Sequence, residues 1–164
     1  MYRILFFLLL SNILISQKGW IKTYGADEVD GSNHVLVLDD GYLITGFTKS
    51  FGNGGNDLWI IRTDIDRKEL WNRFYGGMSM ETGYEAIQTK DNGFIILAQT
   101  YSFGAGLSDI WIVKIDSAGN KLWDKTYGGE RVDIGYDINA FLPFSEIKNP
   151  EYLKEASTSE EEDD

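Results

Sequence analysis

Apolar residues run along this chain in short blocks with turn residues between them, and the blocks recur at a regular interval. Residues 94–98 read FIILA and residues 110–113 read IWIV, while YLI at 42–44 and LWII at 58–61 hold the corresponding earlier places. Blocks of this length that are rich in β-branched and aromatic residues predict strands, and the turn residues between them predict hairpins. The pattern therefore predicts an all-β protein.

The blocks belong to an internal repeat. Between residues 39–64 and residues 91–116, 12 of 26 positions are identical without a gap, so one stretch is a duplicate of the other. Trp20, Trp71 and Trp123 begin the related stretches WIKTYG, WNRFYGG and WDKTYGG, which sets a period of 51 and then 52 residues. Intervals of this size are typical of β-propeller blades and other repeat arrays.

Each period contains four predicted strands. In the second copy they lie at residues 84–89, 94–102, 109–116 and 121–127. The first two are joined by Asp91-Asn92-Gly93, and an Asn-Gly pair between apolar runs favours a tight hairpin because both residues tolerate a positive φ. Four antiparallel strands joined by short turns form a meander, which is the unit of a propeller blade.

The distribution of apolar residues favours stacked blades over a two-sheet sandwich. The second and third strands of each copy are apolar on both faces, so both faces must be covered, as they are when each sheet lies between two neighbours. The fourth strand carries Lys121, Asp124 and Lys125, and charge of this kind suits an outer edge strand. The sequence thus predicts tandem four-stranded antiparallel blades of an incomplete β-propeller.

Two blades fill only part of a ring that typically takes about four to eight. The first and last sheets would each leave an apolar face without a neighbour, and we expect these faces to contain Leu43, Ile60, Ile95 and Ile112. Monomeric soluble proteins rarely leave large apolar patches exposed. The pattern therefore predicts self-association through open blade faces.

Residues 1–16 are predicted to be a secretory signal peptide, because Arg3 precedes an apolar run at 4–15 that ends at the small residue Ser16. An apolar helix of that length spans only about 18 Å, which is short of the roughly 30 Å core of a bilayer. An uncleaved anchor and a first core strand are the alternatives. A signal peptide implies a secreted protein, extracellular or in the cell envelope, with no membrane span after its removal.

Residues 17–141 form the predicted β-propeller-type repeat region. Its parts are blade copies at about residues 28–75 and 82–127 and flanking strands at residues 20–24 and 134–141. Residues 142–164 are predicted to be a disordered acidic tail. The last 14 residues hold seven acidic side chains and one lysine, which is −6 of the total formal charge of −11, and such a run repels itself and buries nothing.

The composition of the chain allows a hydrophobic core and excludes several kinds of chemical site. With 43% hydrophobic and 14% aromatic residues, the chain has enough apolar material for a core. It contains no cysteine, which excludes disulfides, thiolate chemistry and cysteine metal sites. The remaining charge on the body of the chain is also negative and opposes phosphate binding, so no nucleic-acid partner is expected.

Two aspartate–tryptophan pairs begin the third strand of each copy, Asp57 with Trp59 and Asp109 with Trp111. Residues two apart point to the same face of a strand. We expect each carboxylate to accept hydrogen bonds from loop or neighbouring-blade amides while the tryptophan packs between blades. A ring of carboxylates around a ligand is the alternative.

No arrangement of residues points to catalysis. His34 is the only histidine, and no serine lies in a G-x-S-x-G elbow. The glycine-rich loops at 50–56 and 102–108 lack the GK[ST] of a phosphate-binding loop. We therefore expect neither an enzyme nor a bound cofactor.

A calcium loop is one alternative that the residues leave open. Asp64-Ile65-Asp66 offers alternating carboxylates, which are ligands that calcium prefers. The EF-hand pattern requires a glycine at its sixth position and a glutamate at its twelfth, where this chain has Glu69 and Tyr75. Only a surface site of another kind would be compatible with this stretch.

The recurring motifs YGG, D[DN]G, S-F-G-x-G and D-[LI]-W-I resemble the secreted bacterial and archaeal β-propeller repeats of the SBBP type, over roughly residues 20–141. The resemblance implies an extracellular or envelope-associated propeller with a binding or scaffolding role. The chain departs from that family in having just over two blades. It also has Ala26 and residues 78–80 where the family has a glycine-rich acidic stretch after YG.

A second resemblance concerns the fourth strand. The stretch from Asp116 to Trp123 is similar to the D-x-x-G-x-x-x-W element of quinoprotein-like propellers, in which the tryptophan docks between blades. This resemblance implies a packing role for Trp71 and Trp123.

These features together predict a secreted, non-catalytic β-propeller repeat module that binds protein or glycan or contributes to an assembly. Two alternatives stay open. One is a truncated fragment of a larger propeller protein without independent function. The other is a glycan- or quinone-related enzyme domain that uses a propeller cleft.

Overall fold

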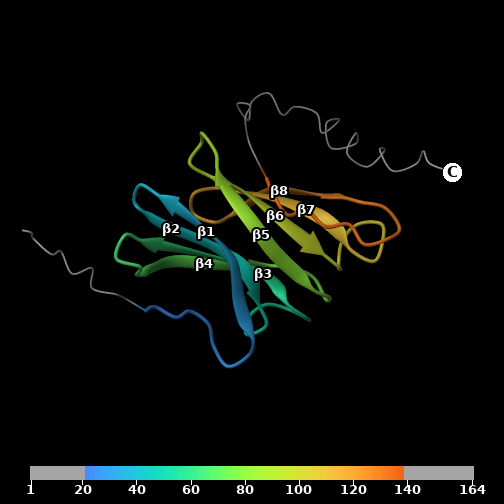
Figure 1. The fold of residues 1–164 in the computed structure, drawn as a ribbon, viewed down its shortest axis with the longest axis horizontal. Helices are drawn as coiled ribbons and strands as arrows, with labels where there is room; N and C mark the ends of the chain where they lie inside the picture. The colour runs from blue at the N-terminus through green and yellow to red at the C-terminus, as the bar shows by residue number, and fades with distance from the viewer. Residues whose placement is uncertain (1–20, 139–164) are drawn as a thin grey trace, which may run out of the picture.

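A computed structural model of the protein describes residues 21–138, and strands are the only regular secondary structure in this range. Eight strands form two four-stranded antiparallel sheets, each ordered as in the chain (Figure 1). The first sheet contains β1 (Asp30–Leu38), β2 (Gly41–Thr48), β3 (Asp57–Asp64) and β4 (Glu69–Tyr75). The second sheet contains β5 (Glu81–Gln88), β6 (Phe94–Thr100), β7 (Asp109–Ile115) and β8 (Lys121–Tyr127). The predicted all-β class, with four antiparallel strands in each copy, is confirmed.

The segments that flank the two sheets are not strands where the structure describes them. Residues 21–24 and 134–138, which belong to the two expected flanking strands, pair with no sheet edge. β5 begins at Glu81, earlier than expected, because its amide donates a 2.8 Å hydrogen bond to the Asn56 carbonyl oxygen of the first sheet's β2–β3 loop. The expected signal peptide and the expected acidic tail lie outside the described residues.

The two sheets repeat each other in their irregularities. The pairing of β1 with β2 shifts between Ser32 and His34, and the pairing of β5 with β6 shifts at the equivalent place, between Gly83 and Glu85. Each third strand also shifts against its fourth near the far end. Counted between equivalent residues, from Thr89 to Gly93 and from Leu38 to Gly41, the hairpin between β5 and β6 is one residue longer than that between β1 and β2, and this accounts for the change of period from 51 to 52.

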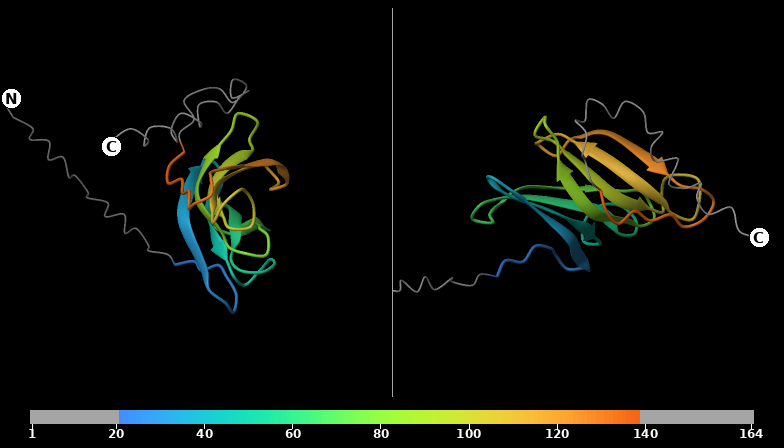
Figure 2. Two further views of the ribbon diagram at one scale, coloured as in Figure 1. Left: turned by 90° about the vertical axis from the view of Figure 1, so that its right-hand side faces the viewer. Right: turned by 45° about the horizontal axis from the view of Figure 1, so that its top comes forward.

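The second sheet lies across one face of the first, with β5 in contact with β1, β2 and β3 (Figures 1 and 2). Buried side chains from both sheets fill the space between them. The first sheet contributes Leu43, Leu58 and Ile60, and the second contributes Phe94, Ile96, Trp111 and Val113. Full burial of one such side chain stabilises the fold by about 1.5–3 kcal/mol, so this intersheet core dominates the packing energy of the described chain.

The outward faces of the two sheets, which point away from the other sheet, carry only some of the residues expected there. Leu43 and Ile60, expected on open faces, are fully buried between the sheets, because alternation places them on the side that β5 covers. Ile95 and Ile112 alternate with intersheet residues and so belong to the opposite face of the second sheet. The opposite face of the first sheet carries Tyr42, Ile44, Trp59 and Ile61.

Trp111→Ala is expected to destabilise the protein more than Trp123→Ala. Trp111 is 1% exposed within the intersheet core, whereas Trp123 is 36% exposed on β8. Truncation of a buried aromatic side chain costs about 3–5 kcal/mol, and truncation of a partly exposed one costs less. Urea unfolding followed by tryptophan fluorescence gives both values, and equal losses would show that the burial of Trp111 is not what stabilises the core.

Candidate functional site

Three carboxylates stand at equivalent places, each six residues after the tyrosine of a YG motif: Asp30, Glu81 and Asp133. Each accepts a hydrogen bond from the backbone amide four residues before it. The donors are Ala26 (3.0 Å), Gly77 (2.8 Å) and Gly129 (2.9 Å). The segment after each YG therefore turns tightly around its own carboxylate.

The first two of these carboxylates also tie down the end of the second strand of their sheet. Asp30 accepts from Thr48 Oγ1 at 2.6 Å and from Ser50 Oγ at 2.7 Å. Glu81 accepts from Thr100 Oγ1 at 2.9 Å and from the Ser102 amide at 3.1 Å. Each carboxylate thus joins the start of the first strand to the loop that leaves the second.

Asp57 and Asp109, the two predicted carboxylates, are almost fully buried at the start of β3 and β7. Asp57 Oδ2 accepts from the Asn53 amide at 2.9 Å. Asp109 Oδ2 accepts from the amides of Ala105 and Gly106 at 3.1 and 3.3 Å. These donors lie in the glycine-rich β2–β3 and β6–β7 loops, so the loops are shaped to supply amides to a buried carboxylate.

At each boundary between repeats, a glycine lies between the carboxylate that begins the third strand and the carboxylate that follows the YG motif. A Cβ added at Gly76 would overlap Asp57 Oδ1 and would stand 2.5 Å from Glu81 Oε2. At the next boundary, a Cβ added at Gly128 would overlap Asp109 Oδ1 and would stand 2.7 Å from Asp133 Oδ2. The first glycine of each YGG is therefore required by space, since no side chain fits between two carboxylates.

The two kinds of carboxylate have opposite electrostatic environments. Burial raises the pKa of Asp57; the Asn53 amide lowers it, and the nearby negative charge of Glu81 raises it further, so that the net shift is upward. For Asp30, burial also opposes ionisation, but hydrogen bonds from Thr48, Ser50 and backbone amides outweigh it and hold the pKa well below its usual range. Asp30 therefore favours the folded state as an anion, whereas ionised Asp57 costs stability.

Sequence analysis missed Asp30, Glu81 and Asp133. The available signal was their constant distance from the YG tyrosines, which becomes visible when the three motifs are aligned with each other. The residues differ in kind (two aspartates and one glutamate), and all three lie outside the stretches of highest identity, residues 39–64 and 91–116. A carboxylate that can be Asp or Glu is easily read as ordinary surface charge.

The predicted tryptophans take different positions. Trp59 and Trp111 are both buried, and each packs against a phenylalanine of the adjacent loop, with ring centroids 5.9 Å from Phe51 and 5.3 Å from Phe103, respectively. Trp71 is partly buried against the intersheet core, where its ring lies beside Gly119. Trp71 thus bridges the two sheets, in contrast to the more exposed Trp123 described above.

The indole nitrogens of the two buried tryptophans are not equally satisfied. Trp111 Nε1 donates to Asp124 Oδ2 at 2.9 Å. Trp59 Nε1 has no hydrogen-bond partner among residues 21–138, and Asn72 replaces the aspartate at the equivalent position of β4. A buried donor without an acceptor costs about 1–3 kcal/mol, so the first sheet has a defect that the second lacks.

A buried cation was also missed by sequence analysis. Lys114 on β7 is 2% exposed, and its Nζ contacts Asp91 Oδ1 at 2.9 Å and Thr89 Oγ1 at 2.7 Å. Hydrogen bonds from Thr89 and Lys114 lower the pKa of Asp91 well below its usual range. Arg62 holds the equivalent place in β3 and pairs with Asp40. In each sheet, a cation from the third strand thus fastens the first hairpin.

Between the two sheets lies a groove of about 240 Å³ beside Asp57. The rings of Phe74 and Phe103, 46% and 41% exposed, belong to its lining, together with Lys121. Aromatic faces next to a charged group can stack on a ligand and orient it. This groove, beside the carboxylates at the boundary between the two sheets, is the candidate binding site.

Asp64, one of the two carboxylates considered for calcium, is engaged in a turn, as is its equivalent in the second copy, Asp116. Asp64 Oδ1 accepts from the Lys68 amide at 2.8 Å, and Asp116 Oδ1 accepts from the amides of Ala118 and Asn120 at 2.9 and 2.8 Å. Within residues 21–138, no three histidine, cysteine, aspartate or glutamate side chains are grouped so that they could hold a metal ion.

A few polar residues of the described chain connect one repeat to the next. His34 Nδ1 accepts from the Ala86 amide at 3.3 Å, and Glu85 Oε2, at the equivalent position, accepts from the Ile138 amide at 2.8 Å. Such bonds hold first strands of successive repeats side by side. The arrangement is suited to building an array and to presenting its grooves.

Comparison of the sequence with models of known protein families and with curated protein sequences finds no match. The resemblance to SBBP-type repeats therefore remains a hypothesis that depends on the motifs alone.

Asp30→Asn and Asp57→Asn are expected to change the pH dependence of stability in opposite directions. The lowered pKa of Asp30 stabilises the fold above the unfolded-state pKa near 4, and this contribution is lost as the pH falls. Asp30→Asn should therefore cost about 1–3 kcal/mol at pH 7 and progressively less in acid.

The raised pKa of Asp57 has the opposite sign, because the stability that it contributes is present in acid and is lost as the pH rises through its folded-state pKa. Asp57→Asn should therefore gain stability relative to the unsubstituted protein as the pH rises from about 3 to 7. Denaturant unfolding across this range measures both trends. Parallel trends for the two variants would contradict the opposite environments of the carboxylates.

Placing the Lys121–Asp124 pair of the second sheet at the equivalent positions of the first sheet is expected to give Trp59 Nε1 a hydrogen-bond acceptor. In the second sheet, Lys121 pairs with Asp124 at 2.8 Å, and the equivalent residues of β4 are Glu69 and Asn72. Glu69→Lys with Asn72→Asp should stabilise the protein by roughly 0.5–1.5 kcal/mol by giving Trp59 Nε1 an acceptor. Asp124→Asn is the matched loss, and an unchanged denaturant midpoint for both changes would refute this role of the acceptor.

Proposed function

We propose that the chain is a non-catalytic β-propeller-type repeat module that acts outside the cell or in the cell envelope, where it binds a protein or a glycan or supports an assembly. The observation that carries this proposal is the use of the recurring polar residues. Asp57, Asp109, Asp30 and Glu81 all accept hydrogen bonds from amides or hydroxyls that join strands and loops within a repeat. They build the array and leave its surfaces for binding.

The geometry of stacking supports blades of a propeller. Consecutive sheets pack face to face with the first strand of one against the face of the other, and the same boundary contacts recur where residues 133–138 follow the second sheet. A contact that repeats from unit to unit generates a regular array, and in a propeller that array closes on itself.

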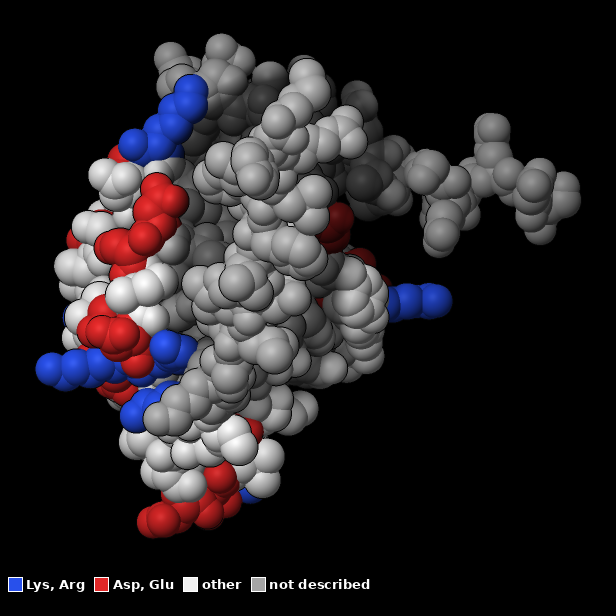
Figure 3. Space-filling view, turned by 60° about the vertical axis from the view of Figure 1, so that its left-hand side comes forward, with Lys and Arg blue, Asp and Glu red and all other residues white. Residues whose placement is uncertain are grey.

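The charge distribution supports a partner other than nucleic acid. On the face shown in Figure 3, the visible lysine and arginine side chains alternate with acidic ones. Nucleic-acid binding requires a continuous basic surface. The exposed rings of Phe74 and Phe103 beside Lys121 offer a better surface for stacking on a sugar or on an apolar side chain of a protein.

Location outside the cell depends on the N-terminal segment of the sequence. The apolar run before Ser16 favours export. Within residues 21–138 there is no helix with the length and hydropathy that a membrane crossing needs.

The proposal is tested by expression in a secreting host. The intact mass of the secreted protein should lack residues 1–16, and the purified protein should bind members of a glycan array or an envelope-protein panel without turning them over. Phe74→Ala with Phe103→Ala should weaken this binding at least about tenfold, the loss of roughly 1.4 kcal/mol of stacking.

The matched control is Val37→Ala, which removes a 71% exposed side chain near the opposite end of the first sheet and should leave binding unchanged. Glycosidase or quinone-dependent turnover that Asp57→Asn abolishes would contradict the non-catalytic role. Retention of residues 1–16 in the secreted protein would contradict the predicted signal peptide.

A further inference from the structure

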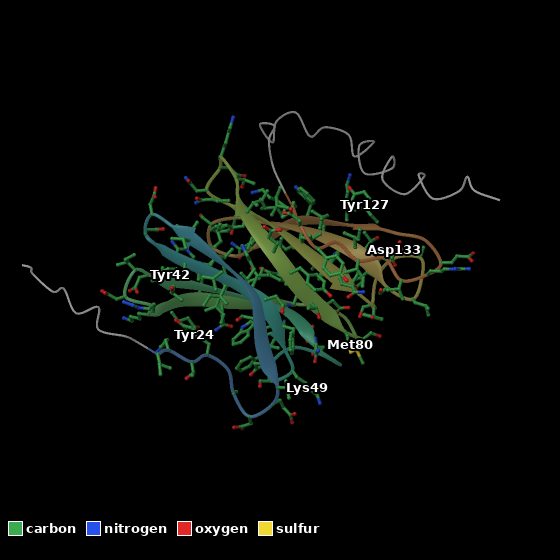
Figure 4. The ribbon with its side chains drawn as sticks, viewed as in Figure 1. Tyr24, Tyr42, Lys49, Met80, Tyr127 and Asp133 are labelled. Carbon is green, nitrogen blue, oxygen red and sulfur yellow. The ribbon has the colours of Figure 1, made fainter. Side chains whose placement is uncertain are left out.

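Residues 21–24, just before β1, contact the first sheet in the same way that the end of β4 contacts the second sheet. Tyr24 Oη donates to the Arg67 carbonyl oxygen at 2.7 Å, and Tyr75 Oη donates to the Gly119 carbonyl oxygen. Arg67 and Gly119 hold equivalent places in the β3–β4 and β7–β8 turns, and both have a positive φ, 67° and 80°. Residues 21–24 therefore occupy the position that the outer strand of a preceding sheet would take (Figure 4).

Burial raises the pKa of the Tyr75 hydroxyl to about 12, although Arg73 opposes the shift. Burial likewise raises the pKa of Tyr24. Both hydroxyls are thus held protonated and donate to a turn carbonyl across the boundary between repeats. The hydroxyl–carbonyl bond is the recurring contact between an outer strand and the next sheet.

The segment after β8 lies against the second sheet as β5 lies against the first. The Asp133 amide donates to the Ser108 carbonyl oxygen at 2.9 Å, as the Glu81 amide does to Asn56 at 2.8 Å. A Cβ added at Gly135 would stand 2.8 Å from Leu97 Cδ1 on the outward face of β6. Residues 133–138 therefore occupy the position that the first strand of a following sheet would take.

Both outward faces of the pair of sheets are thus covered by short segments that stand in for strands. On the first sheet the cover is incomplete, and a groove of about 470 Å³ lies between residues 22–24 and the sheet. Its apolar lining comes from Val35, Tyr42, Ile44, Trp59 and Ile61. On the second sheet, the equivalent face is buried by the first sheet.

The chain itself contains a strand that matches the covering segment. Residues 20–25 read WIKTYG, and residues 123–128, at the end of β8 and just after it, read WDKTYG, which is identical at five of six positions. The equivalent WNRFYG at the end of β4 matches WIKTYG at only three. Tyr127 is equivalent to Tyr24, but its hydroxyl donates no hydrogen bond within residues 21–138. The β8 strand of a second copy therefore presents the same side chains as residues 22–24.

We propose that a second copy of the chain docks head to tail on this face. β8 of one copy replaces residues 21–24 of the other, and β1 of the other replaces residues 133–138 of the first. Tyr127 then donates to Arg67 of the partner copy, and the faces with Ile95 and Ile112 and with Ile44 and Ile61 form a second intersheet core. The two end segments act as caps that oppose this association, which rests on the proposed stacking of propeller-type blades.

The experiment weakens both caps in the full chain. Tyr24→Phe removes the hydrogen bond of the first cap, and Gly135→Val places a side chain against Leu97 under the second. Gly129→Val is the matched control, because a Cβ at Gly129 meets nothing within 4 Å. Light scattering coupled to size exclusion should show that Tyr24→Phe/Gly135→Val associates at concentrations at least about tenfold lower than Tyr24→Phe/Gly129→Val.

Tyr127→Phe then tests the contact itself. Added to the uncapped variant, it should weaken association about two- to tenfold, the effect of one hydrogen bond, without changing the melting temperature of the monomer. A folded uncapped variant that stays monomeric, or association that Tyr127→Phe does not weaken, would overturn the proposal.

If Gly135→Val prevents folding, as judged by circular dichroism, the pair Tyr24→Phe and Tyr24→Phe/Tyr127→Phe makes the same test with one cap intact. Failure here is distinguishable from failure of the proposed binding role, because the readout is the mass of the purified chain and involves no glycan or other protein. Association through Tyr127 in a chain that binds no other partner would refute only the binding role.

Discussion

Within residues 21–138, the boundaries between repeats depend on buried and half-buried carboxylates that are stabilised by backbone amides and hydroxyls. An ionised carboxylate removed from water is costly unless hydrogen bonds replace its hydration. Asp30 and Glu81 receive such bonds from the tight segment after YG and from the end of the second strand, and Asp109 receives them from the glycine-rich loop. The loops and the YGG turns are therefore shaped by the need to solvate these groups, and the apolar packing is built around that frame.

The same constraint explains why glycine recurs in these particular places. Gly52 and Gly104 have φ of 99° and 105°, a region that other residues rarely adopt, and their Cβ atoms would overlap the carboxylates of Asp57 and Asp109. A loop that wraps closely around a buried anion can be made only where the backbone itself is free of side chains. Hydrogen bonding to the buried carboxylate therefore requires the loop conformation that these glycines allow.

Much of the fold could be predicted from the sequence, because apolar blocks and turn residues are local signals. The four strands of each copy and the shared face of Asp57 and Trp59 follow from periodicity alone. Which neighbour covers each face does not follow, since alternation defines two faces without saying which is turned inward, and Leu43 and Ile60 were for this reason placed on the wrong side. Glu81 escaped notice because its role depends on groups that the chain brings together only on folding.

The two sheets are close copies, but they are not equally complete. Trp111 has an acceptor in Asp124, and Trp59 lacks one; Lys114 closes its hairpin with Asp91, and Arg62 does so with Asp40. Duplication supplied the same frame twice, and substitution then changed single contacts within it. The contribution of a single contact can consequently be judged by comparing the equivalent side chains of the two sheets.

The extra residue in the hairpin between β5 and β6 has a consequence for how such a chain can change. It lengthens the repeat by one position, yet the glycine and carboxylates at the following boundary are arranged as at the boundary before it. The hairpin tips thus tolerate insertions that the boundaries do not. They are the places where a foreign peptide could be displayed from the array, because added chain there leaves the stacking of the sheets untouched.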